Sequence, residues 1–277
     1  MGYVIGSWNT RHFSGVGTHD TGKIAEVILS EGFDIVALQE VKRAEAIEFL
    51  KRRLPEWEGC HGQPRTRERD EEFNLGFAFL WNTKRVRECS KDGRPIIFDM
   101  YKSQTVMTRN PYYGRFTPNG LLGGSFFEIR LINIHLWFGK DLALDKQKRL
   151  EEFKLVTRDI YSSLSHRRYG DNMPAYTVVL GDYNFCAVIC HLQENDTAIY
   201  FAGTKQEEKT TLSTKNEVLV NDYDHFGYND NRFSATGVTI ERVDSVSKYM
   251  NNDFDLHMKK LSDHVPIKME LILNQGR

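Results

Sequence analysis

The sequence lacks any run of about 18 apolar residues, so no segment is predicted to cross a bilayer as a helix, and no membrane partner is expected. It also lacks a strong charge of either sign, because 37 Lys and Arg stand against 38 Asp and Glu. That balance excludes a surface coated with basic charge, although local basic patches remain open. No apolar leader precedes the first strand-like run at Tyr3. We therefore expect a cytoplasmic protein if Met1 is native, and a secreted protein if a leader has been removed.

Cysteine is scarce, with four residues in a chain of 277. Cys60, Cys89, Cys186 and Cys190 form no Cys-x-x-Cys pair, which excludes the common zinc knuckles, and free thiols are expected. The sequence also has no internal repeat, low-complexity tract or Pro/Gly-rich linker. We predict a single domain over residues 1–277, long enough to bury a sizeable core, and favour a monomer.

What the sequence does contain is an alternation of apolar strands and amphipathic helices. Helical periodicity indicates helices over residues 20–31, 43–54 and 142–164. Strand-like runs occupy residues 3–9, 33–41, 73–81, 94–100, 123–137, 177–184, 216–226 and 261–273, and the run 123–137 is typical of two strands joined by a tight turn. This interleaving predicts an α/β or α+β protein with sheets at its centre.

Polar side chains recur where the predicted strands end. The buried run at 178–180 stops at Gly181, and Asp182 and Asn184 follow two residues apart, on one side of an extended backbone. Other predicted strands stop at Asn9, Glu40, His135, Asp224 and Asp263 with His264. One cleft in which these ends meet accounts for all of them. Oxygen ligands there would hold a hard cation, and histidines would handle a charged ester.

Each of these residues also has a local explanation. Asp182 and Asn184 could close an Asx turn, and Asn9 and Asp224 could be turn residues. Glu40 could be a charge at a helix N-terminus. His135, in the run INIHLW, is more often a satisfied core histidine than a catalyst when it is taken alone.

The motifs WN, LQEV, GR, NIHL, GDYN, YDHF and SDHVP follow one another along the chain. Over residues 7–273 the sequence resembles the endonuclease/exonuclease/phosphatase superfamily, and most of all its deoxyribonuclease I branch. GDYN and SDHVP are the most specific of these motifs. The resemblance implies a four-layer sandwich, in which two central mixed β-sheets pack face to face with helices outside.

The resemblance also implies roles for the polar strand ends. It implies a metal-dependent phosphodiesterase that uses Mg²⁺, with Mn²⁺ or Ca²⁺ as alternatives. The metal ligands it implies are Glu40, the principal one, with Asn9 and Asp263. Asp182 would orient or deprotonate the attacking water, and Asn184 would contact the phosphate.

The remaining motifs supply the groups that bind the phosphate. By the same resemblance His264 binds the phosphate and Asp224 pairs with that histidine. His135 resembles the second histidine of the deoxyribonuclease branch, and Arg115 in YYGRFTP resembles an arginine that approaches the phosphate. One position departs from the branch, because Leu75 stands where a Glu supports that second histidine.

The predicted substrate is nucleic acid, with DNA favoured over RNA. Arg65, Arg67 and Arg69 precede a strand, and Lys42 follows LQEV, where the branch has residues that face DNA. Basic side chains of this kind neutralise backbone phosphates. The loop is equally compatible with a solvated charged segment. A phosphatase or phospholipase of the same fold, an AP-repair endonuclease and an inactive binding module are the alternatives.

Overall fold

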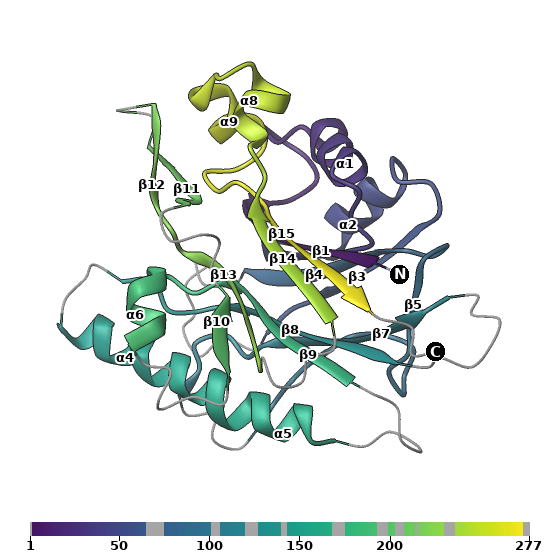
Figure 1. The fold of residues 1–277 in the computed structure, drawn as a ribbon. Coiled ribbons are helices and arrows are strands. Elements are labelled where there is room, and N and C mark those ends of the chain that lie inside the picture. Colours follow the sequence, from purple (N-terminus) through teal and green to yellow (C-terminus); the bar gives the residue numbers. More distant parts are fainter. Residues whose placement is uncertain are drawn as a thin grey trace.

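The structure is a computed structural model. It describes residues 2–64, 75–100, 106–119, 127–139, 143–167, 175–192, 199–202, 208–213, 215, 217–229 and 236–273. Their helices and strands form four layers, with two β-sheets in the middle and helices on the outer face of each sheet (Figure 1). This arrangement confirms the predicted fold class.

The first sheet joins the two ends of the described chain. Its six strands run in the order β14 (Thr236–Arg242), β15 (Ile267–Leu273), β1 (Gly2–Phe13), β2 (Ile35–Val41), β4 (Gly76–Asn82) and β3 (Trp57–Gly62). β1 and β2 are parallel, while the other neighbours are antiparallel. The carboxyl ends of β1 and β2 therefore lie at one edge of the sheet.

The second sheet is also mixed. Its main path is β10 (Tyr200–Ala202), β13 (Asp224–Tyr228), β9 (Ala175–Asp182), β8 (Glu128–His135), β7 (Tyr112–Pro118) and β5 (Val86–Glu88), and β6 (Ile96–Ile97) pairs with β7. β8 and β9 are its parallel pair. A separate ribbon of β11 (Thr211–Ser213) and β12 (Val218–Asn221) stands apart from both sheets (Figure 1).

The space between the sheets is largely apolar, and a buried polar pair within it links the two sheets. Tyr3, Phe79, Phe116 and Leu180 belong to the buried cluster there, and both sheets contribute to it. The link joins Gln39 of β2 to Asn133 of β8, because the Gln39 Nε2 atom donates to Asn133 Oδ1 over 2.8 Å. Both side chains are fully buried, so this hydrogen bond holds the two sheets in a fixed relation.

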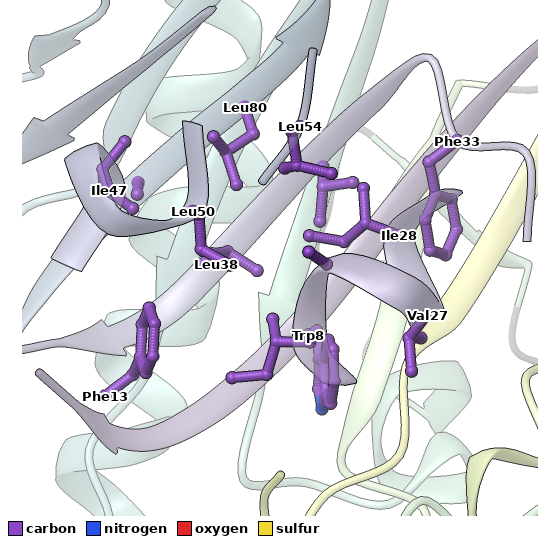
Figure 2. Packing of buried hydrophobic residues seen from close by; sticks show 14 of the residues in the cluster. Trp8, Phe13, Val27, Ile28, Phe33, Leu38, Ile47, Leu50, Leu54 and Leu80 are labelled. Atoms are coloured by element: carbon purple, nitrogen blue, oxygen red, sulfur yellow. The ribbon is translucent and has the colours of Figure 1, made fainter. Parts of the chain in front are cut away.

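Helices α1 (Thr21–Ser30) and α2 (Ala44–Lys51) cover the first sheet. Asp20 caps α1 by accepting a hydrogen bond from the Lys23 backbone N–H. Figure 2 shows Val27 and Ile28 on one helix and Ile47 and Leu50 on the other, facing the sheet. The described chain also has α8 (Ser245–Met250) and α9 (Phe254–Lys260), which precede the last strand.

The outer face of the second sheet carries one long helical run. It consists of α4 (Ala143–Lys154), the π-helical turn η2 (Leu155–Ile160) and α5 (Tyr161–Ser165), followed later by α6 (Ala187–Leu192). Phe153, Val156, Ile160 and Leu164 pack from this run against the sheet. The predicted helix over 142–164 is thus present. Among the described residues no helix combines the length and apolarity needed to span a membrane.

Two predicted strands need correction, and part of a third lies outside the described residues. The run 216–226 is two strands, β12 and β13, because a turn at Asp222 and Tyr223 separates the outlying ribbon from the second sheet. The run 94–100 forms only the two-residue strand β6. The tight turn expected within 123–137 lies outside the described residues, and only β8 is seen there.

Candidate active site

The polar side chains that were predicted to meet come from both ends of strands, except for Asp263 and His264. These two precede β15, which begins only at Ile267, and this corrects the strand expected over 261–273. Glu40 lies near the carboxyl end of β2 in the first sheet. His135 and Asp182 lie at the carboxyl ends of the parallel pair β8 and β9 in the second sheet. Asp224 begins β13 and does not end a strand, which corrects the prediction. Because β13 is antiparallel to β9, its first residue pairs with Asp182, and Asp182 in turn pairs with His135.

Glu40 projects from a break in the pairing of β1 with β2. The register shifts after the pair Asn9–Gln39 and resumes at Phe13–Val41, so residues 10–12 bulge opposite Glu40 alone. Asn9 Nδ2 donates to Glu40 Oε1 over 3.1 Å and lies 2.9 Å from Asp182 Oδ2. Asn9 therefore orients the two carboxylates of the site.

Asp182 and Asn184 follow a close contact between β9 and β8. Gly181 has φ +142°, and a Cβ atom there would lie 2.0 Å from the Ile134 carbonyl oxygen, so only glycine fits. The Asn184 N–H donates to Asp182 Oδ1 over 2.9 Å, while its side-chain amide donates to the Leu136 carbonyl. Burial raises the pKa of Asp182 to about 7, against the opposing effect of the His264 charge.

His264 is held by a carboxylate on one side and faces another. Its Nδ1 lies 2.8 Å from Asp224 Oδ2, and its Nε2 lies 3.8 Å from Asp182 Oδ2. Burial alone would lower the pKa of His264, but the carboxylates of Asp224, Asp182 and Asp263 raise it to about 10. The imidazole is therefore positively charged at neutral pH.

Ser262 connects this histidine to the first sheet. The Ser262 hydroxyl donates to the Asn9 carbonyl over 2.6 Å and accepts the His264 N–H over 3.1 Å. The Trp8 indole also donates to the His264 carbonyl over 2.9 Å. The segment that carries His264 is thereby fixed against β1.

His135 lies between the carboxylates of Glu40 and Asp182. Its Nε2 is 3.8 Å from Glu40 Oε1 and 3.7 Å from Asp182 Oδ2. Within the described residues its Nδ1 atom has no hydrogen-bond partner. Burial lowers the pKa of His135 well below its usual value, and the positive charges of Arg109 and His264 add to the effect, so the ring is neutral.

In the described part of the chain, a pocket of about 840 Å³ is lined by Glu40, His135, Asp182, Asn184, Asp263 and His264, whereas Asn9 and Asp224 support these residues from outside its lining. Its apolar wall includes Leu75, Trp137, Phe138, Leu212 and Val220. Three basic lining residues were missed from the sequence, namely Arg11, His12 and Arg109. Arg11 and His12 follow the WN motif after Thr10, whereas Arg109 belongs to none of the motifs.

Arg115 is not part of this pocket among the described residues, which corrects its prediction as a phosphate-binding arginine. It pairs with Arg130 across β7 and β8, five residues before His135, and that span is about 16 Å along a strand. Arg115 is instead buried against Glu128. The described arginines that line the pocket are Arg11 and Arg109, and Arg109 is only 4 % exposed.

The predicted substrate-binding residues are placed only in part. Lys42 is exposed and directly follows β2, two residues after Glu40, but it does not line the pocket as the described residues form it. Arg65, Arg67 and Arg69 lie outside the described residues. Asp263 does line the pocket, and Arg11 Nε lies 3.4 Å from its carboxylate.

A divalent cation fits the Glu40 side of this pocket. The Glu40 side chain is 14 % exposed, and both its oxygens are fixed, one by Asn9 and one by the His12 N–H at 3.1 Å. In the part of the chain that the structure describes, no three His, Cys, Asp or Glu residues are grouped as a metal-binding cluster. Mg²⁺ does not need such a cluster, because it is commonly held by one or two carboxylates and water.

No protein-family model and no curated protein sequence matches this chain, but several solved structures share its fold. An endonuclease/exonuclease/phosphatase family protein from Bacteroides thetaiotaomicron matches with a TM-score of 0.66 and 14% identity, over 100% of this chain and 97% of the other. D. rerio TDP2 complexed with a single strand DNA product matches with a TM-score of 0.63 and 17% identity, over 98% of both chains.

A mannosyl-6-phosphatase from Bacteroides thetaiotaomicron VPI-5482 matches to the same degree. Its TM-score is 0.63 and its identity 16%, over 98% of this chain and 100% of the other. At these identities the comparisons establish the fold shared with endonuclease/exonuclease/phosphatase proteins. They do not single out the deoxyribonuclease I branch.

Proposed function

We propose that this protein is a metal-dependent phosphodiesterase that hydrolyses the backbone of nucleic acid, with DNA as the first candidate. The observation that carries this proposal is the row Asp224–His264–Asp182, in which His264 and Asp182 line a pocket together with Glu40 and Arg109. The row places a proton acceptor, Asp182, and a fixed positive charge, His264, beside the same part of the pocket. Hydrolysis of a phosphate ester needs both.

Asp182 is the group suited to activate the attacking water. Its Oδ2 atom faces Asn9 and His264, and its Oδ1 atom accepts the Asn184 N–H, so the carboxylate is fixed in direction. A pKa raised to about 7 by burial makes it a stronger base than an exposed aspartate at neutral pH. It can take the proton that water loses as it attacks phosphorus.

His264 and Arg109 are suited to stabilise the charge that develops during the attack. His264 is cationic because Asp224 accepts from its Nδ1–H, which leaves its Nε2–H directed toward Asp182 and the pocket. Arg109 adds a second buried cation to the lining. Fixed cations in a site shielded from water are worth far more than the same cations in bulk solvent.

His135 is suited to the leaving group. A neutral imidazole carries one N–H, and Nε2 is the nitrogen that faces the carboxylates of the site. It can therefore donate a hydrogen bond to the departing oxygen, while water supplies the proton that this oxygen takes up. A divalent ion held by Glu40 would neutralise charge on the phosphoryl oxygens.

The choice of a nucleic acid diester rests on two observations. TDP2, which shares the fold, has been solved with a single strand DNA product. Lys42 is exposed beside the site, where it can neutralise a backbone phosphate. The mannosyl-6-phosphatase of the same fold makes a sugar phosphomonoesterase the second candidate.

A substrate panel tests the proposal. Purified protein is incubated with plasmid DNA, a single-stranded oligonucleotide, bis(p-nitrophenyl) phosphate and mannose 6-phosphate, with Mg²⁺ or Mn²⁺ and with EDTA. We expect both DNAs and the chromogenic diester to be cleaved only in the presence of metal. Cleavage of the monoester alone would favour the second candidate, and activity that survives EDTA would exclude metal dependence.

A further inference from the structure

His12 lies against the carboxylate that is best placed to hold a metal ion. Its Nε2 atom is 3.2 Å from Glu40 Oε2, and its own backbone N–H donates to the same oxygen over 3.1 Å. The side chain is 42 % exposed and lines the pocket. The imidazole therefore reaches the Glu40 carboxylate from the open side of the site.

The backbone is distorted on both strands to bring these two residues together. Arg11, His12 and Glu40 all have positive φ, at 42°, 58° and 59°. Residues other than glycine rarely adopt this backbone conformation, and those that do are concentrated at functional sites. The distortion coincides with the bulge opposite Glu40, which turns His12 toward the carboxylate.

The spacing of the two atoms suits a shared ion. Two ligand atoms at right angles, each about 2.1 to 2.2 Å from one ion, are about 3 Å apart. His12 Nε2 and Glu40 Oε2 meet that requirement at 3.2 Å. His135 meets this distance requirement less well, because its Nε2 is 3.8 Å from Glu40 Oε1. Its side chain is also buried.

We propose that His12 is a nitrogen ligand of the divalent ion that Glu40 holds, and that it shifts the preference of the site from Mg²⁺ toward Mn²⁺. The inference rests on the proposed function, which supplies the ion at Glu40. Imidazole nitrogen suits transition metals, whereas Mg²⁺ favours oxygen ligands and retains its waters. Replacing one water by His12 therefore stabilises bound Mn²⁺ more than bound Mg²⁺.

The test measures the bound ion itself and needs no turnover. Mn²⁺ is added to the full chain and to H12N, and pulsed electron paramagnetic resonance detects nitrogen coupled to the metal. Asparagine tolerates the left-handed backbone of residue 12 and is too short to replace the imidazole. We expect ¹⁴N coupling in the parent, ¹⁵N coupling after ¹⁵N-histidine labelling, and no histidine coupling in H12N.

Calorimetry gives the second readout. We expect H12N to bind Mn²⁺ about tenfold more weakly or worse, with Mg²⁺ affinity changed by no more than about twofold. H61Q is the matched control, because His61 contacts the Val41 carbonyl on the same sheet and does not line the pocket as described. Its ion binding and nitrogen coupling should equal those of the parent.

Three results separate the possible failures. Bound Mn²⁺ without histidine coupling in the parent would overturn the role of His12 and leave the metal-dependent function intact. Coupling that persists in H12N and disappears in H135Q would assign the nitrogen to His135 and overturn the inference as well. If neither ion binds the parent, the metal-dependent function fails, and the inference fails with it.

Discussion

Protonation of one buried histidine should destabilise the protein in mild acid. His257 on α9 is fully buried, and its Nδ1 donates to the Ser262 carbonyl while its Nε2 accepts from the Ser245 hydroxyl, both over 2.7 Å. A ring with one donor and one acceptor is neutral. Burial lowers the pKa of His257 to about 4, against the smaller effect of its hydrogen bond to Ser262.

The sign and size of the effect follow from this shift. The pKa of His257 is lower in the folded chain than the 6.5 of an ordinary histidine. The contribution to stability is therefore fully present above about pH 6.5 and is lost as the pH falls through about 4. The full loss is about 3 kcal/mol, and about 2 kcal/mol of it is already expressed at pH 5.

Urea unfolding of the parent and of H257Q at pH 7.5 and pH 5 measures the contribution of His257 to the free energy of unfolding. Glutamine keeps a donor and an acceptor but does not titrate, so the parent should lose about 2 kcal/mol more than H257Q over this interval. S245A is the control, because it removes one hydrogen bond and leaves the imidazole buried, so its loss should resemble that of the parent. Equal losses in the parent and H257Q would refute the reasoning.

Three further predictions concern the pocket and its surroundings. E40Q should keep the melting temperature of the parent and bind Mg²⁺ at least about tenfold more weakly by calorimetry, because it removes the only charge of that side chain; unchanged affinity would contradict the metal assignment. D182N should lower kcat by about 10² to 10⁴ on a chromogenic diester without unfolding the protein, as judged by circular dichroism. A loss of activity that is accompanied by a large fall in melting temperature would make the residue structural. Replacing Arg65, Arg67 and Arg69 with alanine should raise KM for duplex DNA and flatten its salt dependence while sparing the chromogenic diester; equal losses on both substrates would mean that these residues shape the pocket.

The sequence predicted the polar strand ends because the point at which a strand ends is readable from local pattern. A buried run that stops at Gly181 and is followed by Asp182 states both where the strand ends and which side chain leaves it. Asp224 was expected at the same place for the wrong reason. An antiparallel strand brings its first residue to that edge, and strand direction relative to a distant partner is not written in local pattern.

The residues that sequence missed depend on irregular backbone and on distant contacts. His12 reaches Glu40 only because the two strands bulge together, and no period of two or 3.6 residues encodes that event. Arg109 and Arg115 are six residues apart, yet one lines the pocket and the other binds Glu128 in the sheet. Their separation is set by where β7 begins, which is a tertiary outcome.

The pairing of β15 with β1 has a consequence for biosynthesis. A nascent chain that has emerged only as far as β9 already contains Glu40, His135 and Asp182, but it lacks the strand that flanks β1 and the segment that carries His264. A ribosome adds about 5 to 20 residues per second, so several seconds separate the synthesis of the two halves of the site. The pocket would therefore stay incomplete until the segment with His264 and β15 has been synthesised and has paired with β1.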